Sequence, residues 1–343
     1  MSDVQPSIAS VIPVLNESMH IGACLDSLIA QTLSAKQHLV LVLDGGSEDS
    51  TRNEVTKAIE RSKKINGPLI ELHSNPKKHV AEARNLALKL LPESIQYLVE
   101  MIGHATVEPE HLETRLKEWS RIDTATPAPL GAVGVRVKPR VGKHGMTESW
   151  IERTLCSPLG SGSGQFETFT KSSPTNTPAF AMHSRLALEQ VGGWDASYIT
   201  SQDSDLSMRL LDAGFVIHRT PATSVYMVKR SGLRKWWKMG HRYGFWRMKV
   251  LRKYPKRVSL REFLPWFGLL ATLTLCFLQS EYALVLPGCY LGVLVIEGLR
   301  SSIVSKRISM LFGVPLCLFL LHSSFSIGLF DGLFRKGRAP SDR

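Results

Sequence analysis

The stretch HLVLVLDGGSEDST, residues 38–51, decides how the first part of this chain is expected to fold. Its apolar first half predicts a buried strand that ends on the carboxylate of Asp44. The two glycines that follow predict a tight turn, and Ser47, Asp49 and Thr51 are typical of the start of a helix. A strand followed at once by a helix is the repeating unit of α/β proteins.

The same alternation extends on both sides of this stretch. Residues 7–15, 69–74 and 95–102 are further β-rich runs, while residues 18–29 and 79–91 have helical spacing. Strands that alternate with helices predict a parallel sheet with crossover connections. In such sheets, ligands bind beyond the carboxyl ends of the strands.

Polar clusters stand at or after these strand ends. In chain order they are Asn16 with Glu17, residues 44–51, Arg84 with Asn85 on the third helix, and Gly103 with His104. Each cluster alone also fits ordinary turn or capping chemistry. Because all four are expected at one edge of the sheet, together they indicate a binding site.

The basic charge of the chain is concentrated in one segment. The chain has 42 Lys or Arg against 30 Asp or Glu, and 13 of the basic residues, with no acidic ones, lie between Lys229 and Arg261. The remainder has 42 − 13 = 29 basic residues against 30 acidic. Aromatic residues at helical spacing run through this segment, so residues 229–262 predict an amphipathic helix on an anionic membrane. The competing interpretation, a nucleic-acid patch, is disfavoured because apolar runs follow directly.

Three apolar runs follow, at residues 263–278, 282–299 and 308–330. We expect three transmembrane segments within residues 263–334, with two spans or a re-entrant hairpin as alternatives, since only the third run reaches the roughly 20 residues of a spanning helix. A buried helical core is a less favoured alternative. One observation disagrees with three spans: the RKGR of residues 335–338 would then lie outside, against the tendency of Lys and Arg to stay inside.

Neither the N-terminus nor the cysteines add a site. The opening MSDVQPSIAS has no basic region and no long apolar segment, so it does not predict a signal peptide, and we expect residues 1–228 on the cytoplasmic side of the cell membrane. The five cysteines show no metal-ligand spacing.

Four segments in order resemble the signatures of family 2 glycosyltransferases: VIPVLNES, LVLDGGSEDST, HVAEARNLAL and VGGWDASYITSQDSDLSMRLLDAGF. The resemblance is to the ExoA-like branch, which makes succinoglycan and other exopolysaccharides, and it extends into the C-terminal apolar runs. It implies a GT-A fold in residues 1–228, Rossmann-like, with a mostly parallel sheet flanked by helices. It also implies inverting transfer of a sugar from a nucleotide diphosphate donor to a hydroxyl, as in a hexosyltransferase.

The resemblance further implies which residues meet the donor. It places Asp44 on the base, where a carboxylate can accept from an imide or a ribose hydroxyl. Arg84 is suited to hold neighbouring carboxylates or the diphosphate. The full implied set is Pro13, Asn16, Glu17, Asp44, Ser47, Asp49, Arg84, Asn85, Gly103 and His104.

The chain departs from the family after its fourth strand. Members usually show Asp-x-Asp there and the ExoA-like branch commonly Asp-Ala-His, whereas this chain has Ile102-Gly103-His104. His104 is predicted at the metal or diphosphate position, as a ligand or as a protonated counter-charge; a structural histidine is the alternative. A divalent Mg²⁺ or Mn²⁺ cofactor is left open, because Mg²⁺ prefers oxygen ligands. Lys229 and Arg230 are candidates to offset charge on the leaving diphosphate.

The predicted catalytic base is Asp203. SQDSDLSMRLLDAGF, residues 201–215, matches the family's Glu-Asp motif with Gln202 in place of Glu and Asp203 retained. An inverting transfer needs a carboxylate that takes the proton of the acceptor hydroxyl. Capping of the following helix by Asp203 and Asp205 is an alternative that does not exclude this role.

These features together predict a membrane-anchored inverting glycosyltransferase with a lipid-linked saccharide acceptor, active in exopolysaccharide or surface-glycan synthesis. Residues 157–178, rich in Gly, Ser, Thr and Pro, predict a mobile acceptor-side loop. Because Ile102 and Gln202 both depart from the family pattern, the alternative is a catalytically degenerate, nucleotide-binding scaffold of a glycan-assembly complex. A processive synthase is disfavoured, since no Gln-x-x-Arg-Trp motif is present.

Overall fold

A computed structural model describes residues 5–160, 166, 169–229, 232–340 and 342 of the chain. The chain forms two compact units: unit 1 comprises residues 1–141 and 164–228, and unit 2 comprises residues 142–163 and 229–343. Residues 142–160 thus pack with the C-terminal part of the chain rather than with their neighbours in sequence. The predicted loop of residues 157–178 lies partly outside the described residues.

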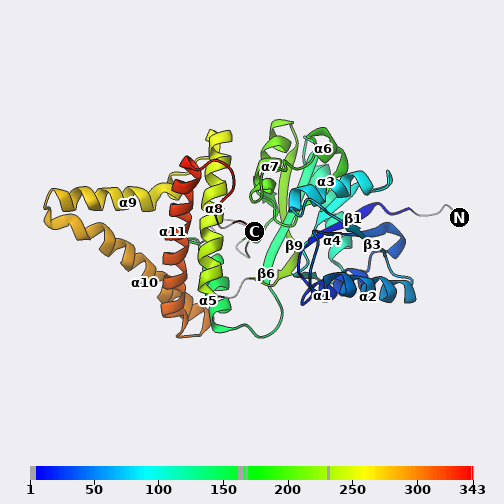
Figure 1. Cartoon of the computed structure of the whole chain (residues 1–343), viewed down its shortest axis with the longest axis horizontal. Coiled ribbons are helices and arrows are strands. Elements are labelled where there is room, and N and C mark those ends of the chain that lie inside the picture. Colours follow the sequence, from blue (N-terminus) through cyan, green and yellow to red (C-terminus); the bar gives the residue numbers. More distant parts are fainter. Residues whose placement is uncertain (1–4, 161–165, 167–168, 230–231, 341, 343) are drawn as a thin grey trace. The chain divides into compact units, whose positions relative to one another are not determined.

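Within the described residues, unit 1 is built on a nine-stranded sheet of order β3-β2-β1-β4-β8-β6-β9-β5, with β7 paired to β9 (Figure 1). Strands β1 to β4 are parallel to one another, and β8 is antiparallel to β4 and β6. β6 and β9 are parallel, while β5 and β7 are antiparallel to β9. The strands are β1 Ile8–Val14, β2 His38–Asp44, β3 Leu69–Ser74, β4 Tyr97–Glu100, β5 Ala105–Val107, β6 Leu130–Pro139, β7 Ser173–Pro174, β8 Met182–Ser184 and β9 Val216–Met227.

Helices cover both faces of this sheet because its central strands are apolar on both sides. In β2, Val40 and Val42 face one core cluster, and Leu39 and Leu41 face the other. The first cluster includes α1 Ile21–Ile29, α2 Thr51–Lys64 and α4 His111–Ala125; the second includes α3 Val80–Leu90, α6 Arg185–Gln190 and α7 Gln202–Asp212. The predicted α/β class is confirmed. The sheet is parallel where the sequence predicted it and mixed beyond β4.

Unit 2 is helical in the residues that the structure describes. Its helices are α5 Met146–Leu155, α8 Leu233–Lys253, α9 Leu260–Phe277, α10 Val285–Ser305 and α11 Met310–Phe334. In the described part of the chain, three helical segments are long and apolar enough to cross a membrane: Leu260–Phe277, Glu281–Ser305 and Met310–Phe334. Helix α8 lies within residues 229–262, for which a basic amphipathic helix on a membrane was predicted; its contact with a membrane stays a prediction. Its apolar stripe, which includes Trp236 and Phe245, is buried, and α8 packs along α11.

Candidate functional site

Two loops at the carboxyl ends of β1 and β2, residues 15–18 and 44–51, are joined by hydrogen bonds; we call them the strand-end loops. The backbone N–H of Asn16 donates to Ser47 Oγ at 2.9 Å, and Asn16 Oδ1 accepts from the backbone N–H of Glu48 at 2.9 Å. Asn16 has a φ of 55°, a left-handed conformation that Asn tolerates better than most residues. Its backbone and side chain therefore both hold the second loop.

Two further contacts close the strand-end loops. Glu17 donates its backbone N–H to Thr51 Oγ1 at 2.7 Å, and Ser18 donates its backbone N–H to Asp49 Oδ2 at 3.1 Å. Pro13, at the base of the first loop, lies opposite Leu43 in the parallel register of β1 and β2. The side chains of Ser47 and Asp49 thus hold the two loops together, and their contact with a donor stays a prediction.

Asp44 ends β2 between these loops, and its side chain is almost fully buried. Its Oδ1 accepts from the backbone N–H of Ser47 at 3.1 Å, and its Oδ2 accepts from Arg52 at 2.8 Å. Burial opposes the charged carboxylate, but these hydrogen bonds hold the pKa of Asp44 below its usual value. Asp44 is thus held as a charged group at the end of β2 by these contacts.

The connection between β4 and β5 lies against the first strand-end loop. His104 Nδ1 is 2.8 Å from Glu17 Oε1. A Cβ at Gly103 would stand 3.0 Å from Glu17 Cγ, so a larger residue there would push this side chain away. The ring of His20, which the sequence analysis did not single out, stands edge-on to His104 with centroids 6.5 Å apart.

The donor set at His104 does not form a metal centre built by the protein alone. Among the described residues, no three His, Cys, Asp or Glu side chains are grouped to hold a metal ion. Glu17 and His104 are hydrogen bonded to each other and supply one carboxylate and one imidazole. Mg²⁺ needs near-ideal octahedral oxygen ligands, which this pair does not provide.

A buried group of charges lies under the sheet end; we call Arg84, Glu100 and His183 the buried cluster. Glu100 Oε2 is 3.1 Å from Arg84 Nη2, and Glu100 Oε1 is 3.1 Å from His183 Nε2. All three side chains are at most 7 % exposed. Burial opposes ionisation of Glu100, but Arg84 and His183 hold its pKa below the usual value. Arg84 was predicted to hold a carboxylate or the diphosphate, and its partner here is Glu100.

Asn85 uses its side chain to hold the segment after α6. Its Nδ2 donates to the carbonyl oxygen of Trp194 at 2.7 Å, and its Oδ1 accepts from the Trp194 N–H at 2.8 Å. Trp194 itself is 2 % exposed and belongs to the core. The contact of Asn85 with a donor stays a prediction, and its observed role is to fix the backbone near the buried cluster.

Asp203 stands in the first turn of α7. Solvent reaches this residue, yet dense protein surroundings, together with the charge of Glu100, raise the pKa of its carboxyl above the usual value. Next to it, Gln202 Oε1 is buried and has no hydrogen-bond partner among the described residues. Asp205 is fully buried and paired with Arg209 Nε at 2.8 Å, which leaves Asp203 as the carboxylate of this turn that can meet a ligand.

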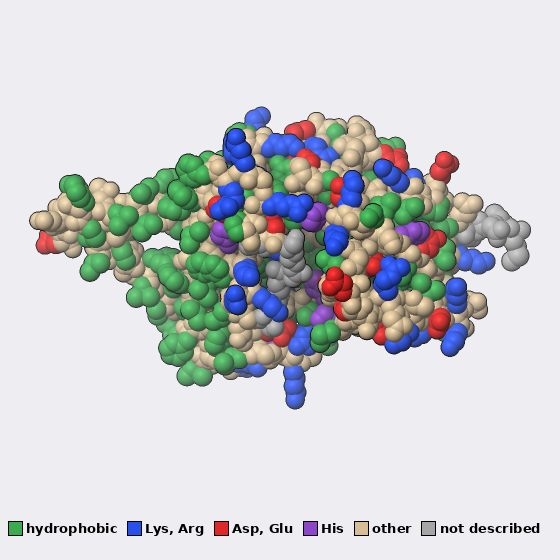
Figure 2. Space-filling view, viewed as in Figure 1, with side chains coloured by type: hydrophobic (Ala, Val, Ile, Leu, Met, Phe, Trp, Pro, Cys, Tyr) green, Lys and Arg blue, Asp and Glu red, His purple; other side chains and the backbone are tan. Residues whose placement is uncertain are grey.

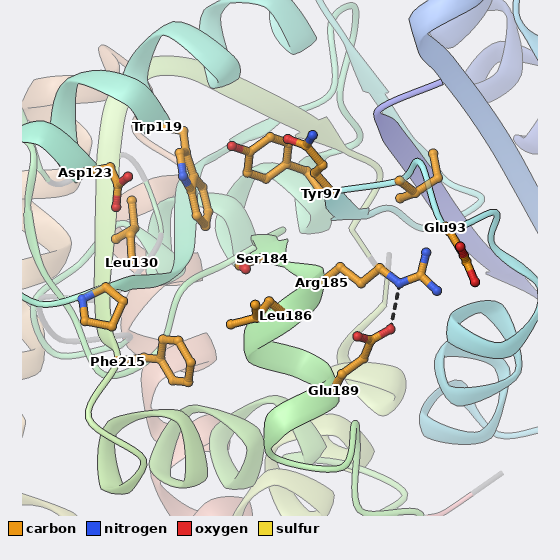
Figure 3. Close-up of a pocket in the computed structure, with 13 residues that line it drawn as sticks. Glu93, Tyr97, Trp119, Asp123, Leu130, Ser184, Arg185, Leu186, Glu189 and Phe215 are labelled. Atoms are coloured by element: carbon orange, nitrogen blue, oxygen red, sulfur yellow. Dashed lines mark hydrogen bonds and ion pairs between the residues drawn. The ribbon is translucent and has the colours of Figure 1, made fainter. Parts of the chain in front are cut away.

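A separate hollow of about 660 Å³ lies at the amino ends of β4 and β6 (Figure 3). Tyr97, Trp119 and Leu130 line it, and Arg185 pairs there with Glu189 at 2.7 Å. None of the residues predicted for the site is among its lining residues. It stands at the edge of the sheet opposite the strand-end loops, so it is not the site that the polar clusters indicate.

The structure brings most of the predicted residues into two groups in unit 1. The strand-end loops hold Asn16, Glu17, Asp44, Ser47 and Asp49, with His104 on Glu17. The second group is the buried cluster with Asp203. Lys229, proposed to offset the diphosphate charge, forms an ion pair with Glu152 within unit 2. Arg230 lies outside the described residues.

Sequence reasoning missed the carboxylate and imidazole of the buried cluster. Glu100 lies inside the β-rich run of residues 95–102 and was not singled out, and His183 comes from β8, 83 residues further along the chain. A charged residue at the end of a strand that is otherwise apolar was the one available signal, because buried charges are nearly always paired.

Comparisons with known proteins agree with this geometry. The family model "Glycosyl transferase family 2" matches residues 10–192. The succinoglycan biosynthesis protein ExoA of Rhizobium meliloti (strain 1021) is 30% identical over 255 residues, 74% of this chain and 73% of that protein. A dolichyl N-acetyl-α-D-glucosaminyl phosphate 3-β-D-2,3-diacetamido-2,3-dideoxy-β-D-glucuronosyltransferase of Methanococcus voltae is 24% identical over 333 residues, 96% of this chain and 97% of that protein.

A solved structure shares the fold. The mannosyltransferase PcManGT from Pyrobaculum calidifontis, determined in complex with GDP-Man and Mn²⁺, superposes with a TM-score of 0.59 at 18% identity. The match covers 96% of this chain and 88% of that one. The expected GT-A architecture is confirmed by this likeness and by the family match.

Proposed function

This chain belongs to glycosyl transferase family 2, and we propose that it transfers a sugar, with inversion, from a nucleotide diphosphate donor to a lipid-linked saccharide at the cytoplasmic membrane face. The names of two relatives support the acceptor and the setting: one acts on a dolichyl-linked sugar phosphate, the other in succinoglycan synthesis. The three apolar helical segments support membrane anchoring.

One observation carries the proposal: Asp203 is a solvent-accessible carboxylate in surroundings that raise its pKa. A base works best when its pKa approaches the working pH, and this environment moves Asp203 in that direction. As the acceptor oxygen forms its bond to the anomeric carbon, its proton passes to Asp203. The bond from that carbon to the donor phosphate breaks at the opposite face, and its electron pair leaves with the nucleoside diphosphate.

The strand-end loops are proposed to bind the nucleotide. Asp44 accepts hydrogen bonds from the base or ribose, while Asn16, Ser47 and Asp49 keep the loops in place before the donor arrives. Pro13 and Glu17 border the same space. Preorganised loops lower the entropy cost of binding, so the donor meets a site that needs little rearrangement.

His104 is proposed to meet the donor diphosphate. Glu17 accepts from Nδ1–H, which fixes the ring and directs Nε2 toward a ligand. A protonated imidazole would place a positive charge there, whereas a neutral one would offer a lone pair. Gly103 lets the backbone approach Glu17, and Arg84 and Asn85 support the site from the buried side. The donor set at His104 does not fit a metal centre built by the described residues alone.

The test is calorimetric titration of the detergent-solubilised protein with UDP and GDP, each with and without Mn²⁺ or Mg²⁺. Binding to one of the nucleotides is expected, and His104→Ala should weaken it. His20→Ala is the matched control. The His20 ring stands beside His104, and in the part of the chain that the structure describes it makes no hydrogen bond to the Glu17 side chain. Binding that depends on metal and is lost in His104→Ala would assign the histidine as a ligand. Absence of binding to either nucleotide would contradict the proposed donor site.

A second measurement separates catalysis from scaffolding. Slow hydrolysis of the donor sugar nucleotide in the absence of acceptor is expected of an active transferase, and Asp203→Asn should abolish it. Nucleotide binding without any hydrolysis or transfer would favour the degenerate scaffold, toward which Ile102 and Gln202 point.

A further inference from the structure

In unit 2, the basic helix α8 and the apolar helix α11 run side by side (Figure 1). Glycines make their close approach possible. A Cβ at Gly244 of α8 would collide with the carbonyl oxygen of Phe325, and one at Gly328 of α11 with the carbonyl oxygen of His241. Trp236 near the start of α8 donates to the carbonyl oxygen of Cys317 at 2.8 Å, and Gly332 near the end of α11 faces Phe245, so the pairing covers much of both helices. The two helices therefore occupy the same depth in any membrane.

Helix α8 cannot lie in hydrocarbon. It carries eight Lys or Arg and no Asp or Glu, and charged side chains within a bilayer are costly. Arg234, Lys235 and Lys238 are exposed in its first turns, and Arg252 and Lys253 in its last. Because Arg242 and Arg247 stand in the middle of α8 as well, no orientation places α8 across the bilayer without burying charge. A helix bound along α8 is held at the surface with it.

The first half of α11 is fixed by polar segments as well. Trp150 of α5 packs against Gly313, and Arg307, just before α11, donates to Ser149 Oγ at 3.1 Å. In the middle of α11, His322 Nε2 lies 2.9 Å from the carbonyl oxygen of Leu159. If α11 crossed the membrane, α5 with its charged residues would be drawn into the hydrocarbon.

Helices α9 and α10 differ, because they project as a hairpin. No residue of α9 is buried, and the first half of α10 is likewise exposed and apolar. Figure 2 shows hydrophobic side chains gathered over this hairpin, while Lys and Arg side chains gather over α8. The bases of both legs rest on α11: Trp266 donates to the carbonyl oxygen of Ser326 at 3.1 Å, and Gly298 faces Leu311. With 18 residues, α9 is about 27 Å long, close to the thickness of the hydrocarbon layer.

The residues after α11 fold back onto α8. Trp246 Nε1 donates to Asp342 Oδ1 at 3.0 Å, and Lys249 Nζ donates to the carbonyl oxygen of Arg335. The C-terminal tail therefore stays on the side of the basic helix.

We infer that only the α9–α10 hairpin enters the bilayer core, while α11 lies along the membrane surface beside α8, with the C-terminal tail on the same side as α8. This differs from the three spans expected from hydropathy. It also removes the disagreement over the RKGR of residues 335–338, which now stays with the other cations. The inference rests on the membrane association proposed above and does not depend on which sugar is transferred.

The experiment is thiol labelling of the full chain in sealed membranes. Cys156, Cys276 and Cys289 are replaced by Ala, which leaves only the buried Cys24 and Cys317. Single cysteines are then placed at exposed positions before α9 (Lys256→Cys), between α9 and α10 (Glu281→Cys) and after α11 (Lys336→Cys, with Arg338→Cys as a second reporter). Each is treated with an impermeant maleimide, and a permeant one measures the total thiol.

Lys336→Cys and Arg338→Cys should label from the same side as Lys256→Cys, and Glu281→Cys should be protected from that side. Labelling of the tail only from the side opposite Lys256→Cys would show that α11 crosses and would overturn the inference. So would labelling of Glu281→Cys together with Lys256→Cys, because the hairpin would then not enter the bilayer. Since Lys256→Cys is the internal reference, the result stands whether or not the proposed cytoplasmic sidedness or the nucleotide-binding proposal holds.

Discussion

The strand-end loops and the buried cluster lie at one edge of the same sheet but are stabilised by different kinds of contact. The loops are held by short-range hydrogen bonds between backbone N–H groups and small side chains, and much of their surface is open to solvent. The buried cluster holds Glu100 between Arg84 and His183 away from water. The first arrangement fixes a shape, and the second fixes an electrical environment.

Because the two regions are held by different contacts, substitutions in them should have different energetic effects. Loops built from many modest hydrogen bonds lose a little binding with each substitution, because each net contribution is about 0.5–1.5 kcal/mol. A buried ionic group behaves as a unit, since removal of one partner leaves an uncompensated charge. Substitutions in the loops should therefore lower donor affinity. Substitutions in the buried cluster should instead change the stability of the fold and the pKa values of nearby groups.

The largest effect is expected at the carboxylate that the buried cluster influences. Asp203→Asn removes the proposed base and should lower the turnover rate about 10²–10⁴-fold, while nucleotide affinity stays unchanged. Single-turnover transfer and calorimetry on the same preparation measure the two quantities. Asp212→Asn, at the far end of α7, is the matched control. Near-normal turnover of Asp203→Asn would assign the base elsewhere.

Removal of the charge at the centre of the buried cluster is expected next in size. Glu100→Gln leaves Arg84 without its ion-pair partner, and the free energy of unfolding should fall by about 3 kcal/mol or more. Because the folded-state pKa of Glu100 is lowered, its stabilising contribution is present above about pH 4.3 and lost as the pH falls through the folded value. The deficit relative to the parent, followed by tryptophan fluorescence in denaturant, should shrink in acid. A deficit that is constant with pH, or equal to that of the exposed Glu93→Gln, would argue against a charged Glu100.

A smaller effect is expected in the strand-end loops. Asp44→Asn keeps the shape but not the charge of this side chain, and nucleotide affinity should fall about tenfold to hundredfold. Glu48→Gln is the control, because the Glu48 backbone and not its side chain makes the contact with Asn16. Calorimetry with the nucleotide that binds the parent protein gives the comparison. Equal affinities of the two variants would remove Asp44 from the donor site.

Asn85→Ala probes the boundary between the two regions. It removes both hydrogen bonds to the Trp194 backbone and should lower the free energy of unfolding by about 1–2 kcal/mol. Lys89→Ala, exposed on the same helix, controls for the helical context. If the variant loses donor affinity with no loss of stability, then Asn85 contacts the donor, as the family resemblance implied.

The smallest expected effect is on the pH profile. The pKa of Asp203 is raised by its surroundings and by the charge of Glu100, so Glu100→Gln should lower it. A base must be deprotonated to act, and the acid limb of the rate profile should therefore move to lower pH. Measurement of kcat/KM against pH, for the parent and for Glu100→Gln, tests this. An unmoved limb would mean that Glu100 acts on stability alone.

Much of unit 1 could be predicted because its information is local. The apolar run of residues 38–44 can be buried on both faces only as an inner strand, and its boundaries matched β2 at both ends. The polar residues that follow the first two strands were expected at one edge, and the parallel register of β1 and β2 brings Asn16 and Ser47 within hydrogen-bond distance.

What could not be predicted depends on pairings between distant segments. His183 reaches Glu100 because β8 enters the sheet antiparallel to β4, and no spacing in the sequence specifies that insertion. The apolar stripe of α8 was expected to face a membrane, since its periodicity cannot tell lipid from another helix. The apolar composition of its partner, α11, is equally typical of a helix packed on another helix and of a membrane span.

The pairing of α8 with α11 also sets an order of events during synthesis. Translation proceeds from the N-terminus, so α8 emerges with its apolar stripe uncovered, and the partner that covers it is made only after the hairpin of α9 and α10. During this interval the stripe is free to adhere to the membrane or to a chaperone. The small residues of α11 then let it pack against α8 once it has been made. A bulky substitution at Gly328 would prevent this packing and leave the apolar stripe of α8 uncovered.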